Sequence, residues 1–329
     1  MVESEQLKRL NFAKLNSLLR NTFPQATYTD KSTSSAVILE SGETSFAYIT
    51  TNSVSPLSVA LTLIRPNMSL NLVLDDEDAQ IAQQVLGLKT NCTLWTVHKD
   101  SLSKHSLIDP LQISTEISAS NEILEILERN NCDVLTEHGI LKAYVKGLEV
   151  AQVLEDENKV GHLQVGVGIY DQEAHKLVDR STQIDTKLQE IIDEVLKYRN
   201  KESIPHPLNR LARGKWLIHE LTETHKEYGL ENFQQIPSPI GSTKISENFP
   251  AFATARAGSS LILCVSYAGA DLKAVTAAAQ LLPATSADEI WFFHPPMDKH
   301  KAIQRQAEHL KVPAKFMPIN EPWPTTIDS

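Results

Sequence analysis

Two stretches of the chain, one toward each end, repeat the same order of apolar runs and helix-length segments. In the first stretch, apolar runs at 46–50, 70–74 and 92–97 alternate with helix-length segments at 58–64 and 78–88. In the second stretch, apolar runs at 261–266, 290–294 and 315–319 alternate with helix-length segments at 271–282 and 298–310. A crossover between parallel strands needs the length of a helix, so this alternation is typical of parallel α/β units. The pattern predicts two βαβαβ arms on either side of a dissimilar middle.

We therefore expect an α/β protein in which two Rossmann-like βαβαβ segments flank a central block of long strands and helices. The two segments either arose by duplication or are unrelated α/β units, and the few residues they share do not decide between these alternatives. The expected boundaries are an N-terminal α/β segment over 1–130, a central block over 131–231, a proline-rich loop or linker over 232–259 and a C-terminal α/β segment over 260–329.

Composition limits the class of protein. The chain is 41% apolar and 22% charged, as in ordinary globular proteins. Its net charge of −10 argues against a globally basic surface for nucleic acid, although a local basic patch remains compatible with it. No apolar run approaches the length of a membrane span, and the N-terminus lacks the apolar region of a signal peptide. The cysteines at 92, 132 and 264 lack metal-ligand spacing and are expected to be free thiols. We expect a cytoplasmic protein without a membrane partner.

The central block contains the first candidate for chemistry, Glu149. Two long strands are predicted, over 139–154 and 162–169. Along the first, Glu149 alternates in phase with apolar residues such as Val145 and Val153. A carboxylate on an apolar face needs a partner or a shifted pKa. Glu149 is therefore a candidate catalytic acid, and the alternative is a structural ion pair.

A second candidate follows the next strand. Gly166 and Gly168 lack the third glycine of a dinucleotide-binding loop. Asp171, with Glu173 and His175, is a candidate catalytic residue that would bind a divalent cation or transfer a proton. Alternatively, Asp171 caps a helix and the residues after it are solvated.

A local excess of positive charge supplies the third candidate. Residues 197–215 contain six lysines or arginines and one glutamate. A helix predicted over 208–222 places Arg210 and Arg213 on one face. With His206 and Asn209 nearby, the two arginines are candidate ligands for a phosphate or carboxylate. In the alternative interpretation, one of the arginines is the structural partner of Glu149.

Other motifs point to no specific reaction. The four acidic residues at 75–78 suit either Mg²⁺ or helix capping. A PD-(D/E)xK nuclease would need a lysine two positions after Glu149, where alanine stands. Glu137, Glu149 and Lys146 would form only a degenerate version of that site. The chain contains no P-loop, GxSxG, HExxH or kinase signature.

Three motifs resemble those of a family of uncharacterised actinobacterial proteins. They are GLEVA at 147–151, VGVGIYDQEAH at 165–175 and HPLNRLARGKWL at 206–217, and the likeness is sharpest over 145–217. The family carries no assigned activity, so the resemblance implies no function or catalytic residue. It implies only that the middle block and the arms belong to one intact protein.

The leading hypothesis is a cytoplasmic protein that binds a phosphate-bearing ligand, either a nucleotide or nucleic acid, near the central block. In it, Glu149 is the buried acid, Arg210 and Arg213 bind the anion, and Asp171 is a secondary contact. Metal-dependent hydrolysis is compatible with this hypothesis, but the sequence names no metal or cofactor. The alternative is a non-catalytic assembly or regulatory protein in which Glu149 and the arginines form an internal ion-pair network.

Overall fold

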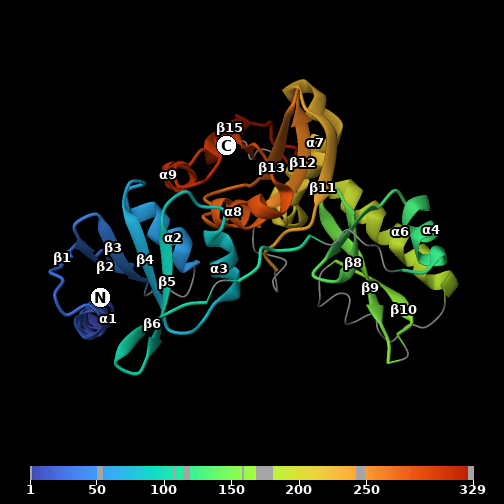
Figure 1. The fold of residues 1–329 in the computed structure, drawn as a ribbon. Coiled ribbons are helices and arrows are strands. Elements are labelled where there is room, and N and C mark those ends of the chain that lie inside the picture. The colour runs from blue at the N-terminus through green and yellow to red at the C-terminus, as the bar shows by residue number, and fades with distance from the viewer. Residues whose placement is uncertain are drawn as a thin grey trace. The chain divides into compact units, whose positions relative to one another are not determined.

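The strands and helices predicted for both arms are present in the structure, a computed structural model that describes residues 2–49, 55–106, 108–113, 119–157, 159–167, 181–241 and 249–324. The fold is mixed α/β, with three sheets among these residues (Figure 1). The chain forms two compact units. Unit 1 comprises Met1–Leu111, Leu272–Ser286 and His300–Ala314, and unit 2 comprises Gln112–Asp271, Ala287–Lys299 and Lys315–Ser329.

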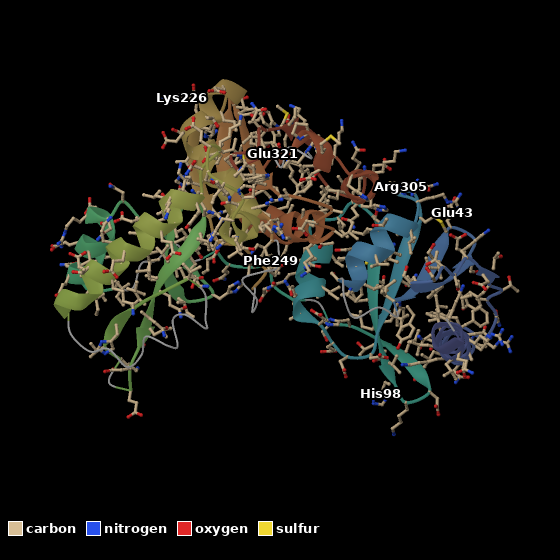
Figure 2. All side chains as sticks on the ribbon, turned by 180° about the vertical axis from the view of Figure 1, so that it is seen from behind. Glu43, His98, Lys226, Phe249, Arg305 and Glu321 are labelled. Atoms are coloured by element: carbon tan, nitrogen blue, oxygen red, sulfur yellow. The ribbon has the colours of Figure 1, made fainter. Side chains whose placement is uncertain are left out.

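Unit 1 contains a sheet whose strand order follows the chain. Its strands are β1 (Thr29–Asp30), β2 (Ala36–Ser41), β3 (Thr44–Ile49), β4 (Ser69–Leu74), β5 (Cys92–His98) and β6 (Ser101–Lys104). The central strands β3, β4 and β5 run parallel, and helices α2 (Pro56–Leu63) and α3 (Ala79–Val85) provide the crossovers. Figure 2 shows Glu43 and His98 at opposite edges of this unit, as expected for the start of β3 and the end of β5.

Helix α1 (Val2–Thr22) is the amphipathic helix that the leucine spacing predicts. Leu15, Leu18 and Leu19 are buried in a cluster with residues of β2, β3 and β4, so the helix packs on the body of unit 1. Leu7 and Leu10 remain exposed on the same helix.

Helices α8 (Lys273–Thr285) and α9 (Lys301–Ala307) come from the second arm but pack in unit 1, on α3 and α2 respectively. The contact between the arms here is reciprocal. Leu88 and Leu310 form an antiparallel bridge. The Lys89 amide donates to the His309 carbonyl at 2.9 Å, and the Lys311 amide donates to the Gly87 carbonyl at 3.0 Å.

Unit 2 contains an antiparallel sheet and a second, mixed sheet. The antiparallel sheet has the order β10-β9-β8-β7, with β7 (Asp133–Glu137), β8 (Ile140–Val145), β9 (Leu148–Glu155) and β10 (Gly161–Val165). Helices α4 (Asn121–Arg129) and α6 (Ser181–Tyr198) share an apolar core with it.

The second sheet of unit 2 follows the chain in the order β11 (Glu231–Ile236), β12 (Ala251–Ala257), β13 (Ser260–Ser266), β14 (Glu289–His294) and β15 (Ala314–Pro318). β11, β12 and β13 are antiparallel, and β13 and β14 are parallel. Helix α7 (Arg213–Thr224) packs on β12 and β13, and Trp216 and Leu217 enter their core. The antiparallel sheet and helix α7, which together position the site described below, therefore both lie in unit 2.

The prediction of one long strand through Glu149 is wrong. The chain reverses at Lys146 and Gly147, whose φ angles of 49° and 71° form a tight turn between β8 and β9. The reversal changes which residues face the core. Leu148 and Val150 join the apolar cluster, so Glu149, between them, lies on the opposite face of the sheet. A bulge in the β8–β9 ladder then brings Ala151 into the core as well.

Two further predictions are corrected. The loop or linker predicted over 232–259 contains β11 and β12 at its two ends; their Gln, Asn and Ala residues gave no alternation of apolar and polar positions. The helix predicted over 208–222 is divided into a short 3-10 helix η1 (Pro207–Arg210) and α7, because Ala212 adopts a left-handed conformation with φ of 44°. Asp171 lies outside the described residues.

Candidate functional site

The β8–β9 hairpin presents polar side chains on the face away from its apolar core. Lys142 and Tyr144 of β8 and Glu149 of β9 share this face, and Glu137 ends the neighbouring strand β7. Helix α7 adds Lys215 from its first turn. The sequence places five ionisable groups from four elements around one position.

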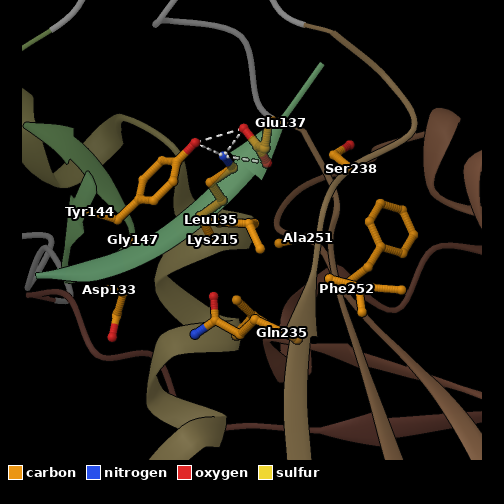
Figure 3. Close-up of a pocket in the computed structure, with 12 residues that line it drawn as sticks. Asp133, Leu135, Glu137, Tyr144, Gly147, Lys215, Gln235, Ser238, Ala251 and Phe252 are labelled. Atoms are coloured by element: carbon orange, nitrogen blue, oxygen red, sulfur yellow. Dashed lines mark hydrogen bonds and ion pairs between the residues drawn. The ribbon is translucent and has the colours of Figure 1, made fainter. Parts of the chain in front are cut away.

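Glu137, Tyr144 and Lys215 form a closed triad (Figure 3). The Lys215 ammonium donates to both carboxylate oxygens of Glu137, at 2.9 and 2.8 Å, and to the Tyr144 hydroxyl at 2.8 Å. The Tyr144 hydroxyl donates to Glu137 Oε2 at 2.6 Å. All three protons of the ammonium thus have an acceptor.

Electrostatics keep Glu137 ionised. Burial raises the pKa of its carboxyl, but the charge of Lys215 and the hydrogen bonds from Lys215 and Tyr144 outweigh burial and lower the pKa to about 2. Burial also lowers the pKa of Lys215, against the attraction of Glu137. The pKa of Tyr144 is raised well above its usual value, by burial and then by the charges of Glu137 and Glu149. The tyrosine is therefore a neutral hydrogen-bond donor.

Glu149, the candidate acid, belongs to this cluster but has its own lysine. Lys142 Nζ lies 2.8 Å from Glu149 Oε2, and the two side chains are 21% and 20% exposed. The cluster thus pairs two carboxylates with two ammonium groups. Its ion-pair partner here is Lys142, whereas the ion-pair hypothesis gave it Arg210 or Arg213.

The space beside the triad is too small for a substrate. A cavity lined by Glu137, Tyr144, Lys215, Gln235 and Ser238 has a volume of about 10 Å³, which is about that of one water probe. No group of three or more His, Cys, Asp or Glu side chains suited to a metal occurs among the described residues. The triad is a closed polar network that joins β7 and β8 to α7.

The arginines form a separate cluster around the start of α7. Arg199, at the end of α6, is completely buried. Its guanidinium donates to the backbone carbonyls of Lys146, Leu208 and Leu211, at 2.6 to 3.1 Å. It therefore ties the β8–β9 turn to the segment around η1. Burial, and then the charge of Arg213, lower the pKa of Arg199 to about 9.

Arg213 is half-buried in the first turn of α7, and Arg210 is exposed at the end of η1. Burial lowers the pKa of Arg213, as does the charge of Arg210, while Asp298 and Glu321 act in the opposite direction. The Arg213 guanidinium lies 4.7 Å over the ring of Trp323, and Arg199 lies 4.1 Å over that of Trp216. The centroids of the two indole rings are 5.7 Å apart, so each of two neighbouring tryptophans has an arginine over its ring.

No carboxylate among the described residues lies within ion-pair distance of Arg199, Arg210 or Arg213. The lysines nearby differ, since Lys142, Lys146 and Lys215 each have a glutamate within 3.5 Å. The arginine cluster is therefore a positive centre without a direct ion pair among the described residues, and Asp298 and Glu321 act on Arg213 only at longer range.

His206 and Asn209 support this centre from η1. The ring of His206 stacks on Tyr198 at 3.8 Å, and its Nδ1 accepts from the Leu208 amide. Asn209 is buried, and its backbone carbonyl oxygen accepts from Arg213 Nε at 2.9 Å. The four predicted ligand-binding residues thus lie close together, with His206 and Asn209 in structural positions.

An open groove of about 330 Å³ adjoins the arginine cluster. Arg199 lines it, together with Lys146, Lys201, Glu220, Glu227 and Glu321. Glu321, labelled in Figure 2, also acts electrostatically on Arg213, so the groove and the cluster are neighbours. The acidic residues at 75–78 belong to unit 1, where Asp78 caps α3 and Asp75 pairs with Lys14 at 2.6 Å.

Sequence patterns did not identify Tyr144, Lys215, Arg199 or Trp323. The sequence points only to Glu137, in a nuclease-like arrangement with Lys146, but Lys146 Nζ instead lies 3.5 Å from Glu220 Oε1. The available signal was the dipeptide Lys-Gly at 146–147, which permits a tight turn and would have placed Glu149 beside Lys142.

No helix among the described residues is long and apolar enough to cross a membrane. No protein-family model, curated protein or solved structure matches the chain.

Proposed function

We propose that the chain binds a phosphate-bearing ligand at the cluster of Arg210 and Arg213, with buried Arg199 holding the cluster in position. One observation carries the proposal: no carboxylate among the described residues lies within ion-pair distance of the three neighbouring arginines, while Lys142, Lys146 and Lys215 each have a glutamate. Like charges raise the free energy of such a cluster, and a bound anion lowers it. The planar fork of a guanidinium matches the oxygens of a phosphate.

The proposal includes binding but no hydrolytic role for Glu149. Both carboxylates of the neighbouring cluster, Glu137 and Glu149, already accept from an ammonium group. The remaining space there holds about one water. Glu149 of β9 is paired with Lys142, and not with Arg210 or Arg213, the partners that the sequence hypothesis gave it.

The experiment is a thermal-shift titration with inorganic phosphate, ADP and a single-stranded oligonucleotide. Ligand at one hundred times its Kd stabilises a protein by about 2.7 kcal/mol. We expect a rise in Tm for the wild type that is lost in Arg210→Ala and Arg213→Ala, each compared with its own ligand-free Tm. Arg256→Ala, at an exposed arginine of β12, is the matched control and should retain the rise. A rise that persists in both cluster variants contradicts the proposal.

A second candidate function is a non-catalytic assembly or regulatory protein with an internal charge network. The closed triad of Glu137, Tyr144 and Lys215 favours it, because a network whose donors all have acceptors has no group left for a substrate. The network uses lysines where the sequence hypothesis had arginines. The titration distinguishes the candidates, since this one requires no phosphate-dependent shift.

We also propose that the two arms are duplicated copies of one Rossmann-like unit. The reciprocal backbone bonds around Leu88 and Leu310 support this, as do identical residues at equal separation along the chain. These pairs are Ile81 and Ile303, Gln84 and Gln306, Leu88 and Leu310, and Lys89 and Lys311. For location, we infer the cytoplasm, because the three cysteines are free.

A further inference from the structure

The groove beside the arginine cluster has the size of a small-molecule site. Its volume of about 330 Å³ lies within the range of about 300–1,000 Å³ that ligand pockets occupy. It is bordered by the end of α6, the β8–β9 turn, α7, the 3-10 helix η2 (His225–Tyr228) and residues 319–322. One of its residues, Arg199, is completely buried and fixed by four hydrogen bonds, so this part of the groove is preformed.

The groove carries cations and carboxylates in equal number. Lys146, Arg199 and Lys201 are the cations, and Glu220, Glu227 and Glu321 are the carboxylates. Only the pair of Lys146 and Glu220, at 3.5 Å, is within ion-pair distance among the described lining residues. Lys201, Glu227 and Glu321 therefore keep their hydrogen-bonding capacity for a ligand, unlike the residues of the closed triad.

This charge pattern favours a ligand with two kinds of group. Ammonium and guanidinium groups bind phosphate oxygens, and carboxylates accept hydrogen bonds from hydroxyl groups. A phosphorylated polyol such as ribose 5-phosphate, alone or as part of a mononucleotide, contains both. A nucleic-acid strand contains a phosphate at every residue, and three carboxylates in the groove would repel it.

We infer that this groove binds a small phosphorylated polyol, with the phosphate toward Lys201 and the hydroxyl groups toward Glu227 and Glu321. The inference rests on the proposed phosphate site and assigns its ligand class. The proposed function leaves open whether the ligand is a small sugar phosphate or a nucleic acid, and this inference chooses the sugar phosphate.

The test is isothermal titration of the full chain with inorganic phosphate, ribose 5-phosphate, AMP, ribose and a single-stranded oligonucleotide. A hydrogen bond to a charged group contributes about 1.5–3 kcal/mol, so ribose 5-phosphate should bind at least about tenfold more tightly than inorganic phosphate. Glu227→Gln should remove this advantage and leave the affinity for inorganic phosphate unchanged. Lys201→Ala should weaken both phosphate compounds.

Two matched controls lie outside the groove lining. Glu223→Gln, on the exposed part of α7, and Lys226→Ala, on η2 and labelled in Figure 2, should both leave all affinities unchanged. If phosphate binds but ribose 5-phosphate gains nothing and Glu227→Gln has no effect, this inference is overturned and the proposed function stands. If no phosphate compound binds, the proposed function fails and the inference fails with it. Tighter binding of the oligonucleotide than of AMP, or equal binding of ribose, also overturns the inference.

Discussion

Glu137 and Glu149 lie on the same face of one sheet and each accepts from a lysine, yet they should contribute differently to stability. The Glu137 side chain is 8% exposed and that of Glu149 is 20% exposed. The Lys215 side chain is 21% exposed, but all its hydrogen bonds go to Glu137 and Tyr144, so replacing Glu137 by glutamine removes its countercharge at a buried position and costs about 3 kcal/mol. In Glu149→Gln, Lys142 can turn toward water, and the cost should be about 1 kcal/mol. Urea unfolding measures both losses in free energy of unfolding. Equal losses would show that Glu137 is no more important to stability than Glu149.

The same residue should determine how stability depends on acidity. The folded-state pKa of Glu137, about 2, lies below its usual value of 4.5. Its ionised form therefore stabilises the fold above about pH 4.5, and this contribution is lost as the pH falls from 4.5 toward 2. We expect the difference in free energy of unfolding between wild type and Glu137→Gln to shrink over this interval. A difference that stays constant down to pH 2 would mean that Glu137 is not ionised in the fold.

At the scale of elements, two glycines test the contact between the β8–β9 turn and α7. Gly139 and Gly147 both follow a residue with positive φ in a tight turn, and their own φ angles are 79° and 71°. A methyl group on Gly147 would lie 2.4 to 2.5 Å from backbone atoms of Lys215 and Trp216, whereas on Gly139 it would meet nothing within 4 Å.

Gly139→Ala should therefore cost only the strain of a left-handed residue, about 1–2 kcal/mol. Gly147→Ala should cost clearly more, because the turn must move away from the helix that carries Lys215. Thermal unfolding of the two variants gives the comparison. Equal Tm values would indicate that the turn and α7 are not in close contact.

The reciprocal contact of the arms predicts equal effects at equivalent positions. Leu88 and Leu310 are 4% and 2% exposed and form one bridge in unit 1. Leu88→Ala and Leu310→Ala should each lower the free energy of unfolding by about 2–5 kcal/mol, and by similar amounts. Chemical denaturation of both variants is the measurement. A large loss at one position only would argue against equivalent roles.

Strands and helices with strong apolar periodicity were predictable from sequence, and those formed by weak patterns were not. All ten elements of the two arms were located within a few residues, because their apolar runs are separated by helix-length segments. β11 was missed because its sequence, ENFQQI, is mostly polar. The β8–β9 turn could not be predicted from alternation, because Lys146 fits the polar phase and Gly147 the apolar phase of one continuous strand, and that error placed Glu149 on the wrong face.

At the scale of the whole molecule, the units are not continuous in sequence. Unit 1 needs α8 and α9, which begin at Lys273 and Lys301, far along the chain from the end of its sheet at Lys104, so a fragment of residues 1–130 lacks the partners of α2 and α3. We expect that fragment to expose Leu57, Leu61 and Ile81, to bind a hydrophobic dye and to unfold without a cooperative transition. Cooperative unfolding of the fragment would mean that its own core suffices.

The candidate site was predictable only where its residues are close in sequence. His206, Asn209, Arg210 and Arg213 lie together because they are close in sequence, so a local charge count was enough. The partners that complete the cluster, Arg199 and Trp323, come from other elements and required the fold.

The placement of an arginine over each of two neighbouring tryptophans has an optical consequence. Of the four tryptophans in the chain, Trp216 and Trp323 lie buried beside guanidinium charges. The emission energy of a buried indole depends on the charges around it, and a guanidinium carbon lies 4.1 Å from the ring centroid of Trp216 and 4.7 Å from that of Trp323. We therefore expect an anion that moves Arg213 relative to Trp323 to shift the emission wavelength of the protein's tryptophan fluorescence. The chain thus carries its own spectroscopic probe of the arginine cluster.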